Sequence, residues 1–292
     1  MVTTPEVLDY QVRQTPTGID VFAVTADGPH LDGLAQRLRQ ALADIAHAGF
    51  AVLVYDHRFI GDSEGQPRQR IRPSEQLTDR LSAVAFARTL EGIDPDKIVV
   101  WGYSMSAGTA LNAAATDPRI AGAILLCPLL DGRWRSNRCL RTQPRNAAWI
   151  TNQAIKDILG NAVVPVAAHA GGHGVLTFPG ELDGFQSITA PGSAWRNEVR
   201  AAPIPGYSAF RPLAHARNTH CPILIQAGQD INHGEGVTEC LGARADALRH
   251  VDERGGHLRQ QSTHANREDQ REFEEAVVTL DEPFAGHAPL SR

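Results

Sequence analysis

No stretch of this 292-residue sequence approaches the roughly 18 consecutive apolar residues of a membrane-spanning helix, which argues against a membrane protein. Residues 1–14 have neither a basic start nor an apolar core, so they do not resemble a signal peptide. There is no excess of basic residues that would indicate nucleic-acid binding, because 28 basic and 33 acidic residues leave a net charge of -5. We therefore expect a cytoplasmic protein that binds neither nucleic acid nor membrane.

Cysteine is also scarce and shows no close pairing. The four cysteines are Cys127, Cys139, Cys221 and Cys240. A chain of this length can bury a full hydrophobic core without a disulfide framework, so we expect free thiols that mostly serve in packing. The length and the ordinary hydrophobic content of 42% suit one large α/β domain with an insertion.

The most informative segment is residues 102–108, which follow the apolar run 98–101 and lead into the Ala-rich residues 107–115. This order predicts a strand, a sharp turn and a helix, with Ser104 at the apex. Such a nucleophile elbow needs small residues two before and two after the serine, and Gly102 and Ser106 meet that requirement. The alternative is a turn of small residues on an ordinary α/β strand.

The same turn predicts part of an oxyanion hole. A serine at a helix N-terminus leaves the backbone N–H of the next residue, Met105, pointing at any oxyanion that forms. Residue 104 and its neighbour would thus supply both a nucleophile and a hydrogen-bond donor.

Apolar runs alternate with helical patterns along the chain, which predicts a parallel sheet covered by helices on both faces. The expected strands are Ala51–Tyr55, Ile98–Trp101, Ile120–Leu126 and Pro222–Gln226, and the expected helices are about Leu31–Ala48, Gln76–Leu90 and Arg267–Leu280.

Residues 131–218 interrupt this alternation, with an amphipathic piece near Trp149–Leu159. An insertion at the carboxyl edge of a parallel sheet overhangs the place where such folds bind ligands, so we interpret it as a lid on a core formed by residues 1–130 and 219–292. The alternatives are a second domain or an unstructured loop.

A serine hydroxyl needs a base and an orienting acid to become a nucleophile. In elbow folds the chain order is Ser, acid, His, with the acid after a later strand and the histidine before the last helix. Asp230 and His257 fit this order. The alternatives are Asp131 for the acid, and His233 or His264 for the base.

Several segments resemble the α/β-hydrolase superfamily. They are Tyr55 to Arg58, Gly61 to Arg68, Trp101 to Gly108, Asp117 to Ile120, Cys127-Pro128 and Trp195 to Val199. Within the superfamily they are similar to the branch of dienelactone-hydrolase-like and YcjY-type proteins and fungal polyketide transferases, which is related to Xaa-Pro peptidase catalytic domains. The resemblance implies an α/β-hydrolase fold with a mostly parallel central sheet flanked by helices, a helical lid insertion and a shortened N-terminal region. It also implies Ser104, Asp230 and His257 as nucleophile, acid and base.

Upstream of Ala51–Tyr55 this chain has no His-Gly-x-Gly segment, which in family members follows the third strand and completes the oxyanion hole. Residues 16–26 resemble the family's opening hairpin, but they could instead supply the third strand. Because a missing central strand would leave its neighbours without ladder partners, we place the third strand near Val21–Thr25. The oxyanion loop is then Ala26–His30, with the N–H of Gly28 as the second donor.

Other residues carry weaker expectations. Tyr103, Trp149, Phe178 and Trp195 could line an apolar acyl pocket, although these lid aromatics could equally form the lid's own core. Asp56, His57 and Arg58 are expected to form salt bridges, because consecutive residues at a strand end point in different directions. His169 and His173 lack further ligands at metal-binding spacing, so no metal site is expected.

The main hypothesis is a serine hydrolase that cleaves a carboxylic ester, thioester or lactone through an acyl-enzyme, without metal or organic cofactor. A variant of the same mechanism transfers the acyl group to an alcohol or amine. A third possibility is a degenerate hydrolase that binds a polyketide-like ligand without acylation. The expected partner is a small-molecule acyl substrate, and the sequence leaves open whether the chain forms a homodimer.

Overall fold

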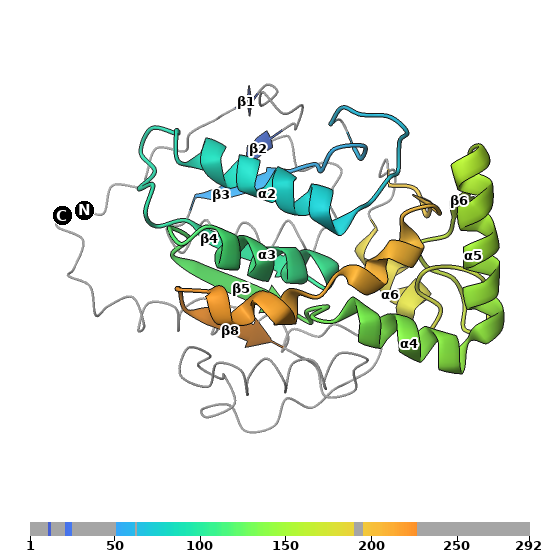
Figure 1. Cartoon of the computed structure of the whole chain (residues 1–292). Coiled ribbons are helices and arrows are strands. Elements are labelled where there is room, and N and C mark those ends of the chain that lie inside the picture. Colours follow the sequence, from blue (N-terminus) through green and yellow to red (C-terminus); the bar gives the residue numbers. More distant parts are fainter. Residues whose placement is uncertain (1–10, 13–20, 25–50, 62, 190–194, 227–292) are drawn as a thin grey trace.

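The structure is a computed structural model, and it describes residues 11–12, 21–24, 51–61, 63–189 and 195–226 (Figure 1). The described strands form two three-stranded sheets and one small two-stranded sheet. Asp230, His257, Gly28 and the alternative bases His233 and His264 lie outside the described residues, as do the predicted helices at 31–48 and 267–280.

The parallel sheet carries the candidate site. It consists of β4 (Val99–Tyr103), β5 (Gly122–Leu126) and β8 (Ile223–Gln226), in the order β4-β5-β8. β4 pairs parallel to β5, and β5 pairs parallel to β8. β5 is almost completely buried, as a central parallel strand must be, and its apolar sequence GAILL reflects this. The predicted strands at 98–101, 120–126 and 222–226 are confirmed.

The second sheet corrects one prediction. β2 (Val21–Val24) pairs antiparallel with both β1 (Gln11–Val12) and β3 (Val52–Tyr55). Residues 21–24 are therefore a hairpin strand, and the prediction that they form the parallel third strand is wrong. Within the described part of the chain, no strand pairs with both β3 and β4.

This pairing also removes the basis of the Gly28 prediction. Val24 pairs with Val52, so β2 ends beside the first residue of β3. The oxyanion loop, by contrast, should follow a strand that ends at the same edge as β4, where Ser104 lies. Gly28 itself is outside the described residues.

Two helices flank the elbow. α2 (Pro73–Ala87) begins with proline at its first position, after the extended residue Arg72, and α3 (Met105–Thr116) follows β4 directly. The Ala-rich sequence of α3 lets it lie close to the sheet, and Ala107, Ala110 and Leu111 are fully buried there. The predicted helix at 76–90 is confirmed, with its start three residues earlier because proline suits the first turn.

The described residues between 131 and 218, the predicted insertion, are largely helical. Its elements are α4 (Gly132–Thr142), α5 (Pro144–Leu159), β6 (Val163–Val164), α6 (Glu181–Ile188), β7 (Val199–Arg200), and the 3-10 helices η2 (Ile204–Ala209) and η3 (Pro212–Asn218). α5 lies at the periphery of the molecule in Figure 1 and has its own small core, which includes Ala154, Val164, Val199 and Ala201. η3 instead contributes Ala216 to the core around α3. The domain boundaries at residues 130 and 219 remain predictions.

Candidate active site

Ser104 occupies the turn between β4 and α3, with φ 54° and ψ -118°. A residue other than glycine avoids positive φ, and a strained backbone of this kind costs about 1 to 3 kcal/mol. Such a conformation persists only where the surrounding structure enforces it. The geometry is that of the sharp strand-to-helix turn which the sequence predicts.

Small residues allow the strand and the helix to cross at this turn. A β-carbon built on Gly102 would lie 2.4 Å from the carbonyl oxygen of Ser106 and 2.6 Å from the backbone nitrogen of Ala107. One built on Gly108 would lie 2.4 Å from the carbonyl oxygen of Leu129. All of these neighbours are backbone atoms, which a rotamer change cannot move. The absence of a side chain at 102 and 108 is therefore a requirement of the turn.

The backbone of Ser104 is held from the β5 side. Its N–H donates to the carbonyl of Leu126 at 2.9 Å, and its carbonyl accepts from the N–H of Leu129 at 2.9 Å. These two bonds fix the peptide units on both sides of residue 104. Ser104 as a whole residue is partly exposed.

Met105 is the first residue of α3, and its N–H has no helical carbonyl one turn earlier to which it could donate. The helix dipole adds a partial positive charge at the same end. Its place at the helix N-terminus is compatible with the predicted role as an oxyanion donor, which stays a prediction.

Asp131, the alternative acid, is fully engaged elsewhere. It caps α4, where its Oδ1 accepts from the N–H groups of Arg133 at 2.8 Å and Trp134 at 3.0 Å. Its Oδ2 accepts from Nε of Arg211 at 3.1 Å. Asp131 thus has a structural role, and Asp230 remains the candidate for the catalytic acid.

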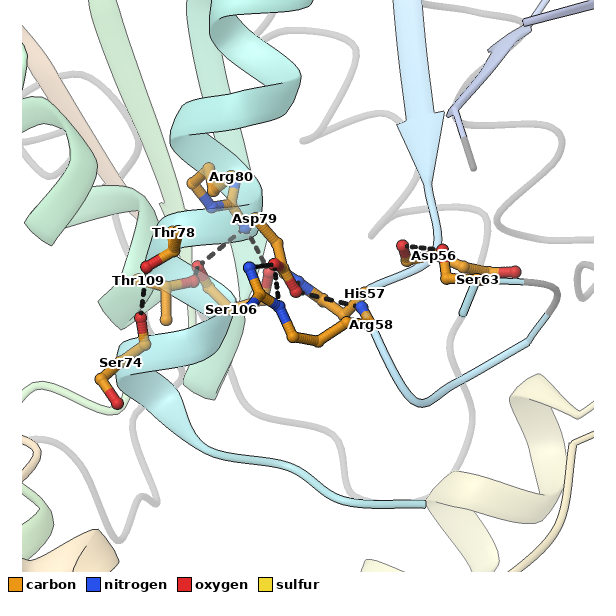
Figure 2. Close-up of polar contacts among 10 residues, drawn as sticks. All are labelled: Asp56, His57, Arg58, Ser63, Ser74, Thr78, Asp79, Arg80, Ser106 and Thr109. Carbon is orange, nitrogen blue, oxygen red and sulfur yellow. Dashed lines mark hydrogen bonds and ion pairs between the residues drawn. The ribbon is translucent and has the colours of Figure 1, made fainter. Parts of the chain in front are cut away.

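Of the three charged residues after β3, His57 and Arg58 pair with Asp79 as expected, and the backbone carbonyl of Asp56 accepts from the hydroxyl of Ser63 (Figure 2). The Nδ1–H of His57 donates to the carboxylate of Asp79 at 3.3 Å, and the side chain of Asp79, on α2, has no solvent exposure. Arg58 bonds the same carboxylate through its backbone N–H at 3.0 Å and its guanidinium at 2.5 Å. Burial by itself would raise the pKa of Asp79, but the hydrogen bonds from His57 and Arg58 hold that pKa below its usual range. His57 is therefore committed to Asp79 and is not a candidate base.

The aromatic residues predicted for the substrate pocket have separate surroundings. Trp149 stacks on His173, with ring centroids 4.8 Å apart, and packs against the small core of the insertion. Phe178 lies under the guanidinium groups of Arg135 and Arg138. Trp195 stacks on Phe185 and is 40% exposed, and Tyr103 is 56% exposed at the end of β4. The contacts of Trp149 favour a role in packing. A role in the substrate pocket remains a prediction for Tyr103, Phe178 and Trp195.

Within the described residues, no three His, Cys, Asp or Glu side chains are grouped so that they could hold a metal ion. Cys127, Cys139 and Cys221 form no disulfide there. No described helix combines the length and the apolar character that crossing a bilayer requires.

Two sequence comparisons identify the family of this chain. The protein family described as Serine aminopeptidase, S33 matches residues 32–170. The quorum-quenching protein AidA of Acinetobacter baumannii (strain MDR-ZJ06) is 35% identical over 223 residues, which cover 74% of this chain and 72% of that relative. This chain belongs to the α/β-hydrolase family. The chain is therefore an enzyme of the serine hydrolase class.

Further similarity supports the hydrolase fold. The crystal structure of the α/β hydrolase GrgF from Penicillium sp. sh18 has a TM-score of 0.62 and 19% identity, over 84% of this chain and 86% of that one. Thiohydrolase aneE of Aspergillus aculeatus (strain ATCC 16872 / CBS 172.66 / WB 5094) is 45% identical over 87 residues. That segment is 30% of this chain but only 27% of the thiohydrolase.

Proposed function

We propose that this α/β-hydrolase cleaves a carboxylic ester, thioester or lactone through an acyl-enzyme formed on Ser104. The observation that carries the proposal is the backbone of Ser104, which is held at φ 54° between a parallel strand and a helix. A strained turn of this kind projects the hydroxyl away from the sheet and directs the next N–H toward the reacting carbonyl.

The chemical step uses Ser104 with the two partners inferred from chain order. His257 accepts the hydroxyl proton while Oγ attacks the substrate carbonyl, and Asp230 orients the imidazole. The N–H of Met105 donates to the oxyanion of the tetrahedral intermediate. His257 then protonates the leaving alcohol or thiol, and a water molecule activated by His257 releases the acid.

The substrate class is supported by the chemistry of acyl transfer and by the similarity to a thiohydrolase. A thioester carbonyl is attacked by the same nucleophile and leaves the same acyl-enzyme as an oxygen ester. The helical insertion would cover the acyl group during the reaction, as a lid does.

A second candidate is binding of an apolar ligand without acylation. It is favoured by one observation: the sequence upstream of β3 lacks the His-Gly-x-Gly segment that supplies the second oxyanion donor in related hydrolases, whereas the elbow supplies the first, the N–H of Met105. Losing one donor costs about 2.7 to 4 kcal/mol of transition-state stabilisation, which would slow but not abolish acylation.

The test is the partitioning of a common intermediate. A p-nitrophenyl ester and a thioester with the same acyl group are turned over in the presence of methanol, and the ratio of methyl ester to free acid is measured. An acyl-enzyme predicts the same ratio from both substrates, because both leaving groups depart before methanol or water attacks. Different ratios would contradict the acyl-enzyme, and the absence of turnover for a broad panel of acyl groups would favour the binding protein. A ratio that strongly favours the methyl ester would identify a transferase.

A further inference from the structure

A buried arginine lies directly beneath the elbow. Arg80, on α2, is only 6% exposed. Its guanidinium donates to the hydroxyl of Ser106 at 2.6 Å (Figure 2) and to the carbonyl of Ser106 at 3.3 Å. It also donates to the carbonyl of Trp101 at 2.9 Å. Trp101 precedes Ser104 by three residues and Ser106 follows it by two, so one side chain bonds both arms of the turn.

These bonds lie where the strand and the helix cross. Gly102 approaches the carbonyl of Ser106 so closely that no β-carbon fits between them. Two elements pressed together at a strained turn tend to separate unless something holds them. The planar guanidinium can bond several acceptors in a fixed geometry, which a single ammonium group cannot do.

Stabilisation of the fold alone does not explain this arginine well. Arg80 forms no ion pair with any described residue, and its buried Nε has no hydrogen-bond partner there. A buried cation that lacks a carboxylate partner loses hydration energy that carbonyl groups replace only in part. Its neighbour Asp79 is occupied by His57 and Arg58, at the end of the other sheet.

Asp79 and Arg80 together connect two sheets that share no hydrogen bonds within the described residues. Asp79 bonds the residues that follow β3, and Arg80 bonds the middle of β4 and the first turn of α3. α2 thereby holds the loop after β3 and the nucleophile turn in one arrangement.

We infer that Arg80 is a positioning residue for the nucleophile, which keeps Ser104 and the N–H of Met105 in reactive geometry by holding both arms of the turn. This inference rests on the proposed function of Ser104. It goes beyond it by assigning part of the reactivity of Ser104 to a side chain that touches neither substrate nor reacting atoms.

The test is the kinetics of phosphonylation by a small fluorophosphonate on the whole chain, with binding constant and maximal rate measured separately. Arg80→Met removes the donors and preserves most of the volume. We expect its maximal rate to fall by about 10- to 100-fold with an unchanged binding constant, because small displacements of reacting groups have effects of this size. Arg80→Lys keeps the charge but replaces the two guanidinium nitrogens that bond Trp101 and Ser106 with a single nitrogen, so its maximal rate should lie between those of the wild type and Arg80→Met.

Arg88→Met is the matched control. Arg88 is a half-buried arginine directly after α2 that bonds the carbonyl of Pro95 and the carboxylate of Asp117, away from the elbow. Its loss should lower the unfolding temperature without changing the maximal rate of phosphonylation. All variants are compared well below their unfolding temperatures.

Each outcome decides a different point. A folded Arg80→Met protein that reacts at the wild-type rate would overturn the positioning role while leaving the proposed function intact. An equal loss of rate in Arg88→Met would show a general effect of destabilisation and would also overturn it. If Arg80→Met does not fold, Arg80→Lys decides, and a wild-type rate there refutes the inference. A wild-type protein that forms no adduct would contradict the proposed function itself, and the inference with it.

Discussion

Gly102→Ala is the smallest change that tests the geometry of the elbow. The added methyl group would lie 2.4 Å from the carbonyl oxygen of Ser106, 2.5 Å from its carbonyl carbon and 2.6 Å from the nitrogen of Ala107. Ordinary contacts between carbon and carbonyl oxygen begin at about 3.3 Å. The strand and the helix must therefore separate by about 1 Å, because every obstructing atom belongs to the backbone.

The expected consequences follow from that displacement. Overpacking of this kind lowers the free energy of unfolding by about 1 to 3 kcal/mol. A shift of about 1 Å at a reacting group costs on the order of 100-fold in rate, so the folded variant should lose most of its reactivity at Ser104. Ester turnover and fluorophosphonate labelling should fall by the same factor, since both depend on the geometry of the same hydroxyl.

The assay compares Gly102→Ala with Gly206→Ala. A β-carbon added to Gly206, in η2, would have no heavy atom within 4 Å, and this glycine does not have positive φ, so a methyl group there is expected to be tolerated. The unfolding free energy is measured by denaturant titration, and the labelling rate is measured on the folded protein. A Gly102→Ala protein with wild-type stability and wild-type labelling would refute the conclusion that this glycine is required by the crossing of β4 and α3.

Three further predictions concern the charged groups around the site and the insertion. Asp79→Asn should lower the unfolding free energy by about 3 kcal/mol, because it leaves the charge of Arg58 poorly compensated. The depressed pKa of Asp79 stabilises the fold fully above its unfolded value of 3.8, and this contribution is lost as pH falls through the folded value. The unfolding free energy, measured by denaturant titration at several pH values, should therefore fall more between pH 7 and pH 2 for the wild type than for Asp79→Asn. An equal fall in both proteins would contradict this. Asp131→Ala should lower the unfolding free energy by about 1 kcal/mol, because it removes the N-cap of α4, and should keep ester turnover. Asp230→Ala should abolish ester turnover. If instead Asp131→Ala abolishes turnover and Asp230→Ala keeps it, Asp131 is the catalytic acid. Asp157→Ala should destabilise the insertion by about 3 to 5 kcal/mol, because it leaves the buried Arg200 without its carboxylate, and unchanged resistance to limited proteolysis within residues 144–200 would argue against this.

The elbow could be predicted because its determinants are local. Small residues at 102, 106 and 108, an apolar run before them and an Ala-rich run after them are all adjacent in the sequence. The strand-turn-helix geometry follows from these constraints with no knowledge of the rest of the chain. The parallel strands were predictable for a similar reason, since strands buried on both faces are continuously apolar.

The direction of β2 could not be predicted in this way. A run such as Val21-Phe22-Ala23-Val24 fits a parallel or an antiparallel neighbour equally well, and the choice depends on partners about 30 residues away. The reasoning that a central strand must be supplied led to the wrong assignment, and the Gly28 donor depended on it.

Arg80 and Asp79 gave no sequence signal of their importance. Charged residues on a helix are usually solvent-exposed, and both are buried here only because their partners lie 21 to 26 residues away in the chain. The aromatic residues of the insertion were similarly ambiguous, since Trp149 and Phe178 serve different neighbours that only the tertiary structure reveals.

The most direct test of a reactive Ser104 is the intact mass of the protein after exposure to a small fluorophosphonate, with Ser104→Ala as the control. The account predicts one adduct on the wild-type protein, mapped to the peptide that contains Ser104, and no adduct on the variant. A folded wild-type protein without an adduct, or an adduct that persists in Ser104→Ala, would contradict the claim that Ser104 is an activated nucleophile.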